Sequence, residues 1–119
     1  MTVEKKTGYG SITVSEDAIA ALTGEIVAEC YGVVGMASRK LLKDGLAVIL
    51  GKENYAKGIV VSRTDAGLVI DAYIIVSFGV RISEVVSETQ KKVKYILEKT
   101  LGEAVSAVNI YVQGVEVME

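Results

Sequence analysis

The stretch that most constrains the fold runs from Gly8 to Met36, GYGSITVSEDAIAALTGEIVAECYGVVGM. At its start Ile12 and Val14 alternate with polar residues, which is the two-residue period of a strand with one buried face. At Ser15 the period changes to three and four residues, and a serine hydroxyl there can cap a helix. The stretch therefore predicts a strand, a capped helix, and then a second short apolar strand or bend.

The helix that follows Ser15 is expected to carry a single apolar stripe. Its members recur at three- and four-residue steps: Ile19, Leu22, Ile26 and Cys30. Glu25 and Glu29 fall away from the centre of the stripe, as expected of a solvated helix face. Gly32 can adopt the left-handed conformation that ends many helices, so the helix is predicted to stop there.

Three further elements follow later in the chain. Gly58 to Arg63 and Leu68 to Phe78 flank the segment TDAG, whose Asp and Gly suit a tight reversal, so they predict an antiparallel hairpin. A second helix is expected from Ser83 to Gly102, where apolar residues again follow a helical period. Val105 to Val117 alternates once more and predicts a long closing strand.

The segment from Leu41 to Tyr55 is harder to assign, because its apolar residues come in clusters without clean alternation. Asp44 could cap a short helix through Leu46 to Leu50, and we favour that helix over a strand. The order of elements then predicts an α+β fold: a two-layer sandwich with a mostly antiparallel sheet, two main helices on one face and a short extra helix. We expect residues 1–7 to be a flexible N-terminus and residues 8–119 to form a single domain.

Composition narrows the class of protein. The chain has 119 residues, half of them hydrophobic, which is enough for one domain with its own core. Fifteen acidic and 13 basic residues give a net charge of −2, so bulk charge does not attract nucleic acid. The sequence shows neither a signal peptide nor an apolar run long enough to span a bilayer. The single cysteine, Cys30, excludes an internal disulfide, and we expect a cytoplasmic protein.

Residues that could carry catalysis are scarce. The chain has no histidine, so the commonest metal ligand and general base is absent, and no metal or cofactor site is predicted. The segment from Gly45 to Lys52 has five residues between its glycines, where a phosphate-binding loop needs four. The acidic pairs have structural explanations: Glu16 with Asp17 at a helix start, Glu25 with Glu29 on a solvated face, and Asp65 with Asp71 around a turn. Cys30 lies on the apolar stripe. We therefore expect a protein that is not an enzyme.

A group of residues on the predicted sheet suggests a binding role. If the isoleucines Ile12, Ile70, Ile74 and Ile110 face the helices, a second set must point to the uncovered side of the sheet. The candidate interaction surface on that side consists of Tyr9, Thr13, Tyr73, Ile75, Asn109 and Tyr111, with Val69 and Asp71 beside them. Aromatic residues on an open face favour protein association. The alternative is that these tyrosines are scattered and simply reflect the preference of tyrosine for strands.

Two further functions remain open at this point. RNA-recognition modules also place a sheet on two helices and stack bases on outward aromatic side chains. Asp71 on the central strand argues against such a module, because phosphates need basic residues beside the aromatics, and Lys91, Lys92 and Lys94 lie on the second helix. A small-ligand site would need converging polar groups, and the sequence shows no such cluster.

The order and spacing of several blocks resemble the alkaline shock protein family, also called the envelope stress response family of Gram-positive type bacteria. The blocks are GYGSITVSEDAI, YGVVGM, LLKDGLAVILGKENYAKGIVV, DAYIIVSFGVRISEVVSETQKKV and VNIYVQGV. Together they cover nearly the whole chain. Ser83 stands where relatives often carry proline, and either residue can begin a helix.

The resemblance implies a small cytoplasmic protein without known catalysis that takes part in cell-envelope homeostasis. It also implies a homo-oligomer, and a separate membrane-anchor protein that holds some relatives at the inner face of the membrane. The chain has no basic amphipathic helix of its own, so we expect any membrane association to be indirect. The resulting hypothesis is a non-enzymatic scaffold or adaptor that self-associates and docks a protein partner.

Overall fold

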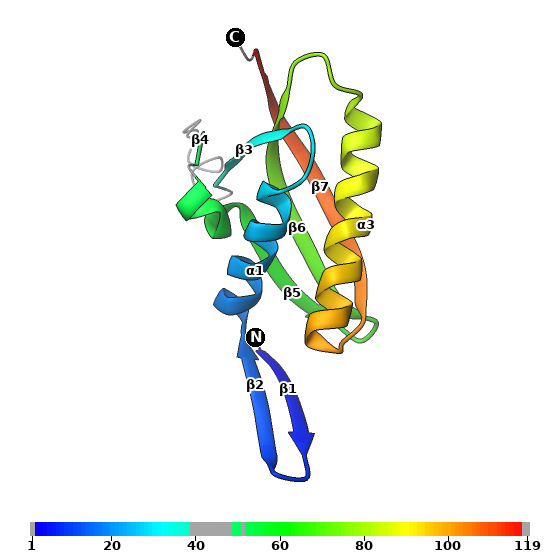
Figure 1. The fold of residues 1–119 in the computed structure, drawn as a ribbon. Helices are drawn as coiled ribbons and strands as arrows, with labels where there is room; N and C mark the ends of the chain where they lie inside the picture. Colours follow the sequence, from blue (N-terminus) through cyan, green and yellow to red (C-terminus); the bar gives the residue numbers. More distant parts are fainter. Residues whose placement is uncertain (1, 39–48, 51, 118–119) are drawn as a thin grey trace.

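The computed structural model describes residues 2–38, 49–50 and 52–117, and this part of the chain contains a two-layer body with helices on one face of a sheet (Figure 1). The helices are α1 (Glu16–Ala28), α3 (Ile82–Leu101) and a 3₁₀ helix, η1 (Lys52–Gly58). The strands are β1 (Thr2–Thr7), β2 (Gly10–Ser15), β3 (Val33–Ala37), β4 (Ile49–Leu50), β5 (Ile59–Thr64), β6 (Gly67–Ser77) and β7 (Val105–Glu116). The predicted α+β class is confirmed.

The main sheet has five strands with β6 at its centre. On one side, β5 pairs with the first half of β6 and β3 with its second half, both antiparallel, and β4 continues the sheet from β3. On the other side, β7 runs parallel to β6 along almost its whole length, because α3 carries the chain back between the two strands. The predicted hairpin is confirmed, with Asp65 and Ala66 as its turn residues.

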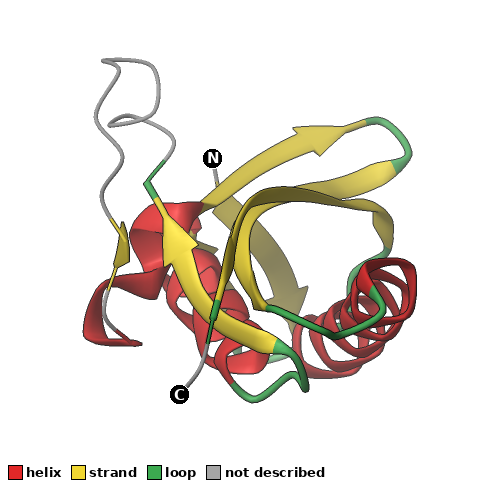
Figure 2. Cartoon of the chain, turned by 90° about the horizontal axis from the view of Figure 1, so that it is seen from above, coloured by secondary structure: helices red, strands yellow, loops and turns green. Residues whose placement is uncertain are grey.

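The two long helices lie on the same side of the curved sheet and contact each other (Figure 2). Between the layers lies a core of fully buried side chains that includes Ile19, Val27, Met36, Leu68, Ile70, Ile74, Val76, Val93, Leu97 and Val105. Ile70 and Ile74 face the helices, as predicted, whereas Ile110 is only partly buried. No described helix is both long and apolar enough to cross a membrane.

The signals at the helix ends are confirmed in part. The Ser15 hydroxyl accepts a hydrogen bond from the Ala18 N–H at 3.1 Å and caps α1. α1 ends at Ala28, four residues before Gly32, and an intervening turn leads into β3. α3 starts one residue before Ser83 and ends at Gly102, whose φ of 66° is left-handed as predicted.

The strand predicted at Gly8 to Val14 does not join the main sheet, and this is a correction. β2 pairs with β1 in a two-stranded antiparallel ribbon that projects from the start of α1 (Figure 1). Ile12, predicted to face the helices, is 55% exposed on this ribbon. The ribbon forms because Gly8 and Tyr9 make a tight turn, so that residues 2–7, predicted as a flexible N-terminus, are the nearest pairing partner in sequence.

The predicted short helix through Leu46 to Leu50 is also corrected where the structure describes it. Residues 46–48 lie outside the described residues, and Ile49–Leu50 form β4 instead of a helix. Leu50 pairs with Met36 of β3 and is buried, so packing against the neighbouring strand outweighs the local pattern. The extra helical segment is η1, which starts at Lys52.

Candidate functional site

The surface of β6 and β7 that points away from α1 and α3 is called here the open face. Side chains alternate along β6: Ile70, Ala72 and Ile74 are fully buried on the helix side, and the residues between them point to the open face. Because β6 and β7 are paired in register, the open face is built from matched neighbours. Its central members are Val69, Asp71, Tyr73, Ile75, Ala107, Asn109, Tyr111 and Gly114.

Tyr73 and Tyr111 form the centre of the open face. They are direct neighbours in the β6–β7 pairing, and their rings are stacked with centroids 4.8 Å apart and planes 15° apart. That separation matches the usual spacing of about 4.8 Å between neighbouring strands, so the backbone itself sets the stack. Tyr111 keeps 42% of its surface exposed, and Tyr73 is partly buried. The result is a pre-ordered aromatic pair that water still reaches.

A polar pair lies beside the aromatic one. The Asn109 side-chain amide donates a hydrogen bond to Asp71 Oδ1 at 2.8 Å, again between direct neighbours in the pairing. This bond engages the one carboxylate among the central open-face members. None of those members is lysine or arginine. The lysines of α3, Lys91, Lys92 and Lys94, are exposed on the helix layer instead. The open face therefore lacks the basic side chains that backbone phosphates require.

Ile75 was predicted to be an exposed apolar residue of this surface. That prediction is wrong, because Ile75 is only 6% exposed. It lies beside Gly114 in the pairing, and a Cβ added to Gly114 would come within 3.3 Å of the Ile75 Cδ1 atom. The missing side chain at Gly114 leaves room into which Ile75 packs. Ile75 therefore closes one end of the open face and adds little exposed surface.

Tyr9 and Thr13 are also separated from the predicted set. Tyr9 is fully exposed in the turn between β1 and β2, and Thr13 pairs with Glu4 on the ribbon. Both positions follow from the ribbon, which pairs apart from the main sheet. The structure thus brings together Tyr73, Ile75, Asn109 and Tyr111 and leaves Tyr9 and Thr13 elsewhere.

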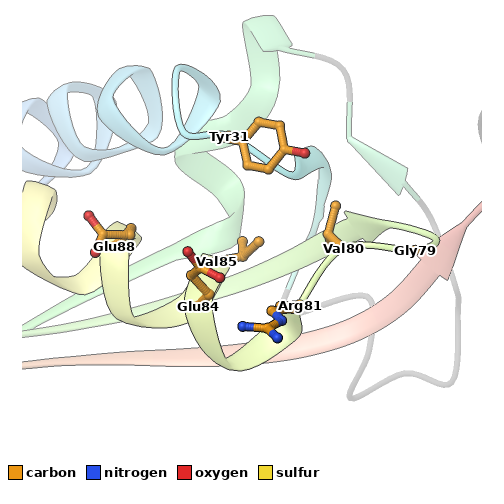
Figure 3. Close-up of a pocket in the computed structure, with 7 residues that line it drawn as sticks. All are labelled: Tyr31, Gly79, Val80, Arg81, Glu84, Val85 and Glu88. Carbon is orange, nitrogen blue, oxygen red and sulfur yellow. The ribbon is translucent and has the colours of Figure 1, made fainter.

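The sequence did not reveal a hollow that forms beside the start of α3 (Figure 3). Its volume is about 300 Å³, and it is lined by Tyr31, Gly79, Val80, Arg81, Glu84, Val85 and Glu88. Tyr31 comes from the turn after α1 and faces the α3 side chains across the hollow in Figure 3. No local pattern could have indicated it, because the two walls are about 50 residues apart in the sequence.

A second hollow of about 400 Å³ adjoins the first and shares Tyr31 and Glu88 with it. Cys30 and Thr89 also line it, but their polar hydrogens are already donated to backbone carbonyls of α1 and α3. The Cys30 thiol donates to the Ile26 carbonyl at 3.3 Å, and the Thr89 hydroxyl donates to the Val85 carbonyl at 2.7 Å. Neither group is poised for chemistry.

The acidic pairs considered in the sequence lie as separate groups. Glu16 and Asp17 occupy the first turn of α1, Glu25 is exposed on this helix, and Glu29 is exposed directly after its end. Asp65 is an exposed turn residue, whereas Asp71 is bonded to Asn109. Within the described residues no group of three or more Cys, Asp or Glu side chains could hold a metal ion.

Comparison with known proteins identifies the family to which the chain is similar. The model of the alkaline shock protein 23 family, described as having a cell envelope-related function, matches residues 4–117. The chain is similar to the uncharacterized protein YloU of Bacillus subtilis (strain 168), with 50% identity over 117 residues and 98% of each chain covered. It is also similar to the uncharacterized protein Spy1614 of Streptococcus pyogenes serotype M6, with 48% identity covering 99% of this chain and 98% of that protein. No solved structure matches the chain with statistical significance.

Proposed function

Because the chain belongs to the alkaline shock protein family, whose function is related to the cell envelope, we propose that it is a non-enzymatic scaffold or adaptor. It acts by self-association and by docking a protein partner. The contact surface for self-association is the open face, and its occupant is a second copy of this chain. The observation that carries the proposal is the stacked pair Tyr73 and Tyr111 on a sheet face that lies opposite both long helices.

The stack suits a binding surface for an energetic reason. Association costs free energy when it immobilises side chains, and an aromatic pair that is already stacked has less freedom to lose. Tyrosine combines a large apolar area with a polar tip, which is why it is enriched where proteins meet. The neighbouring Val69 and Ala107 are small and uncharged, and the carboxylate of Asp71 accepts a hydrogen bond from Asn109.

We assign the protein to the cytoplasmic side of the envelope, where it is held at the inner face of the membrane through an anchor protein. This part of the proposal rests on the resemblance and on the buried thiol of Cys30, the only cysteine of the chain. The anchor would dock on the assembled scaffold. No lipid-binding feature of this chain is required.

Three variants test the open face. Tyr73→Glu and Tyr111→Glu each place a carboxylate in the contact, and burying a charge without a partner is strongly unfavourable. We expect the wild-type protein to be larger than a monomer in light scattering, and both variants to shift toward the monomer mass. Tyr9→Glu is the matched control, because Tyr9 lies on the ribbon and is fully exposed, so this variant should assemble like the wild type.

Circular dichroism of each variant separates lost assembly from lost folding. Tyr111 is 42% exposed, so Tyr111→Glu is expected to fold. A wild-type protein that is monomeric over the whole accessible concentration range would refute self-association. Unchanged assembly in both Tyr73→Glu and Tyr111→Glu would refute the open face as its surface.

A further inference from the structure

The outer edge of β7 is the edge on the side away from β6. Side chains of α3 bond to the backbone in the first part of this edge, at Val105 and Val108. Among the described strands β7 pairs only with β6, so its second edge takes no strand partner there. At the start of β7, side chains of α3 bond to the strand backbone instead. Glu98 Oε2 accepts from the Val105 N–H at 3.0 Å, and the Gln90 side-chain amide donates to the Val108 carbonyl at 2.9 Å.

The printed hydrogen bonds of β6 establish which backbone groups of β7 point outward. The N–H groups of Leu68 and Phe78 donate toward the β7 chain, and the N–H of Ser77 donates toward Gly32 before β3. Even-numbered residues of β6 therefore face β7. Because the register from Ala107 to Val112 is continuous, Val108, Ile110 and Val112 all direct their backbone groups to the outer edge.

Past Val108 this edge is left open. Outside the β6–β7 ladder, no hydrogen bond to Ile110 or Val112 occurs among the described residues. The segment from Ile110 to Val115, IYVQGV, contains no charge and no proline. Natural proteins usually protect an exposed edge with lysine, proline or a covering element, because such an edge pairs readily with another strand. Here α3 side chains bond to the first part, and the β6–β7 register shifts at Gln113, so Ile110 to Val112 is the regular stretch of open edge.

We propose that the β7 edge from Ile110 to Val112 pairs with the same segment of a second copy, antiparallel and about a two-fold axis at Tyr111, so that Ile110 lies opposite Val112. The proposal rests on the proposed self-association and adds a second contact between copies, separate from the open face. A second copy fits because the segment is uncharged, so antiparallel pairing of two copies brings no like charges together. Pairing also satisfies the backbone groups of Ile110 and Val112 in both copies. The two open faces then join into one surface, with both Tyr111 side chains near the junction.

Amide hydrogen exchange tests the pairing directly. In wild-type protein, exchange at the Ile110 and Val112 amides should slow by roughly tenfold or more between a dilute and a concentrated sample, because the second copy protects them. The Val108 amide is the internal comparison, since its residue lies where α3 already reaches the edge. Assembled protein in which the Ile110 and Val112 amides exchange as fast as in the monomer overturns edge pairing and leaves association through the open face intact. A wild type that never assembles overturns both.

Discussion

The β1–β2 ribbon and the main sheet show how similar sequence patterns lead to different surroundings. GSITVS in β2 alternates much as VNIYVQ does in β7, and both segments form strands. In the sheet, alternate residues of β6 such as Ile70 are fully buried against the helices. On the ribbon, Ile12 borders a hollow of about 320 Å³ beside the end of α3 and stays largely exposed. Alternation thus identifies a strand, whereas burial depends on what the strand packs against.

The largest expected difference comes from deleting the same side-chain atoms in the two regions. Ile70→Ala should lower the free energy of unfolding by about 2–5 kcal/mol, because it leaves a cavity in a closed core. Ile12→Ala should lower it by less than about 0.5 kcal/mol, since the residue is mostly in water already. Urea denaturation of the two variants measures both values. Equal losses would mean that the ribbon is packed as tightly as the sheet.

The two tight turns offer a second comparison. Gly67 and Gly10 have φ of 130° and 139°, where any other residue is strained by about 1–3 kcal/mol. A Cβ on Gly67 would also lie 2.5 Å from the Ala104 carbonyl oxygen, whereas nothing lies within 4 Å of one on Gly10. Gly67→Ala should therefore be the more destabilising variant by about 1 kcal/mol or more in thermal denaturation. A Gly10→Ala variant that is as unstable as Gly67→Ala would show that backbone strain alone sets the loss of stability at both turns.

A smaller effect is expected at the junction between ribbon and body. Ser15 ends β2 and caps α1, so Ser15→Ala should cost about 1 kcal/mol of unfolding free energy through the lost bond to Ala18. Arg81, at the equivalent position of α3, makes no side-chain cap bond. Arg81→Ala is therefore the control and should change stability by less than about 0.5 kcal/mol. Chemical denaturation followed by circular dichroism separates the two results.

The smallest effect concerns alkaline pH. Tyr55 is buried beneath α1, and this burial raises the pKa of its phenol above the ordinary value of 10.0. Below pH 10 the phenol is neutral in both the folded and the unfolded chain, and its contribution to the free energy of unfolding is fully present. As the pH rises further, ionisation of the phenol favours the unfolded chain. Tyr55→Phe should therefore lose less stability than the wild type between pH 10 and 11.5. Parallel loss in both proteins would contradict this assignment.

Local patterns predicted much of the fold because the signals act over a few residues. The Ser15 cap, the Gly102 helix end and the Asp65-Ala66 turn each depend on contacts within one turn of chain. The partner of a strand depends on the whole chain. For this reason the ribbon, the β4 strand at Leu50 and the parallel course of β7 differ from, or go beyond, what periodicity indicates.

The candidate surface was predicted in the same partial way. Alternation placed Tyr73 and Tyr111 on one face, but only the register makes them stacked neighbours. The pattern also placed Tyr9 and Thr13 there, because it could not distinguish the ribbon from the sheet. Ile75 was expected in water because alternation does not account for the space beside Gly114.

Local sequence patterns were enough to predict the hairpin of β5 and β6, the helix α3 with its end at Gly102, and the Ser15 cap of α1. The sequence also contains no histidine. The resemblance carried by its blocks, from GYGSITVSEDAI to VNIYVQGV, also determined the family. Contacts between distant segments set the rest: Tyr73 stacks on Tyr111, Tyr9 lies apart from them, and α3 bonds to one part of the β7 edge and leaves the other open. The physical reason is that periodicity reports on one strand at a time, whereas a surface is made by strands that meet from distant parts of the chain.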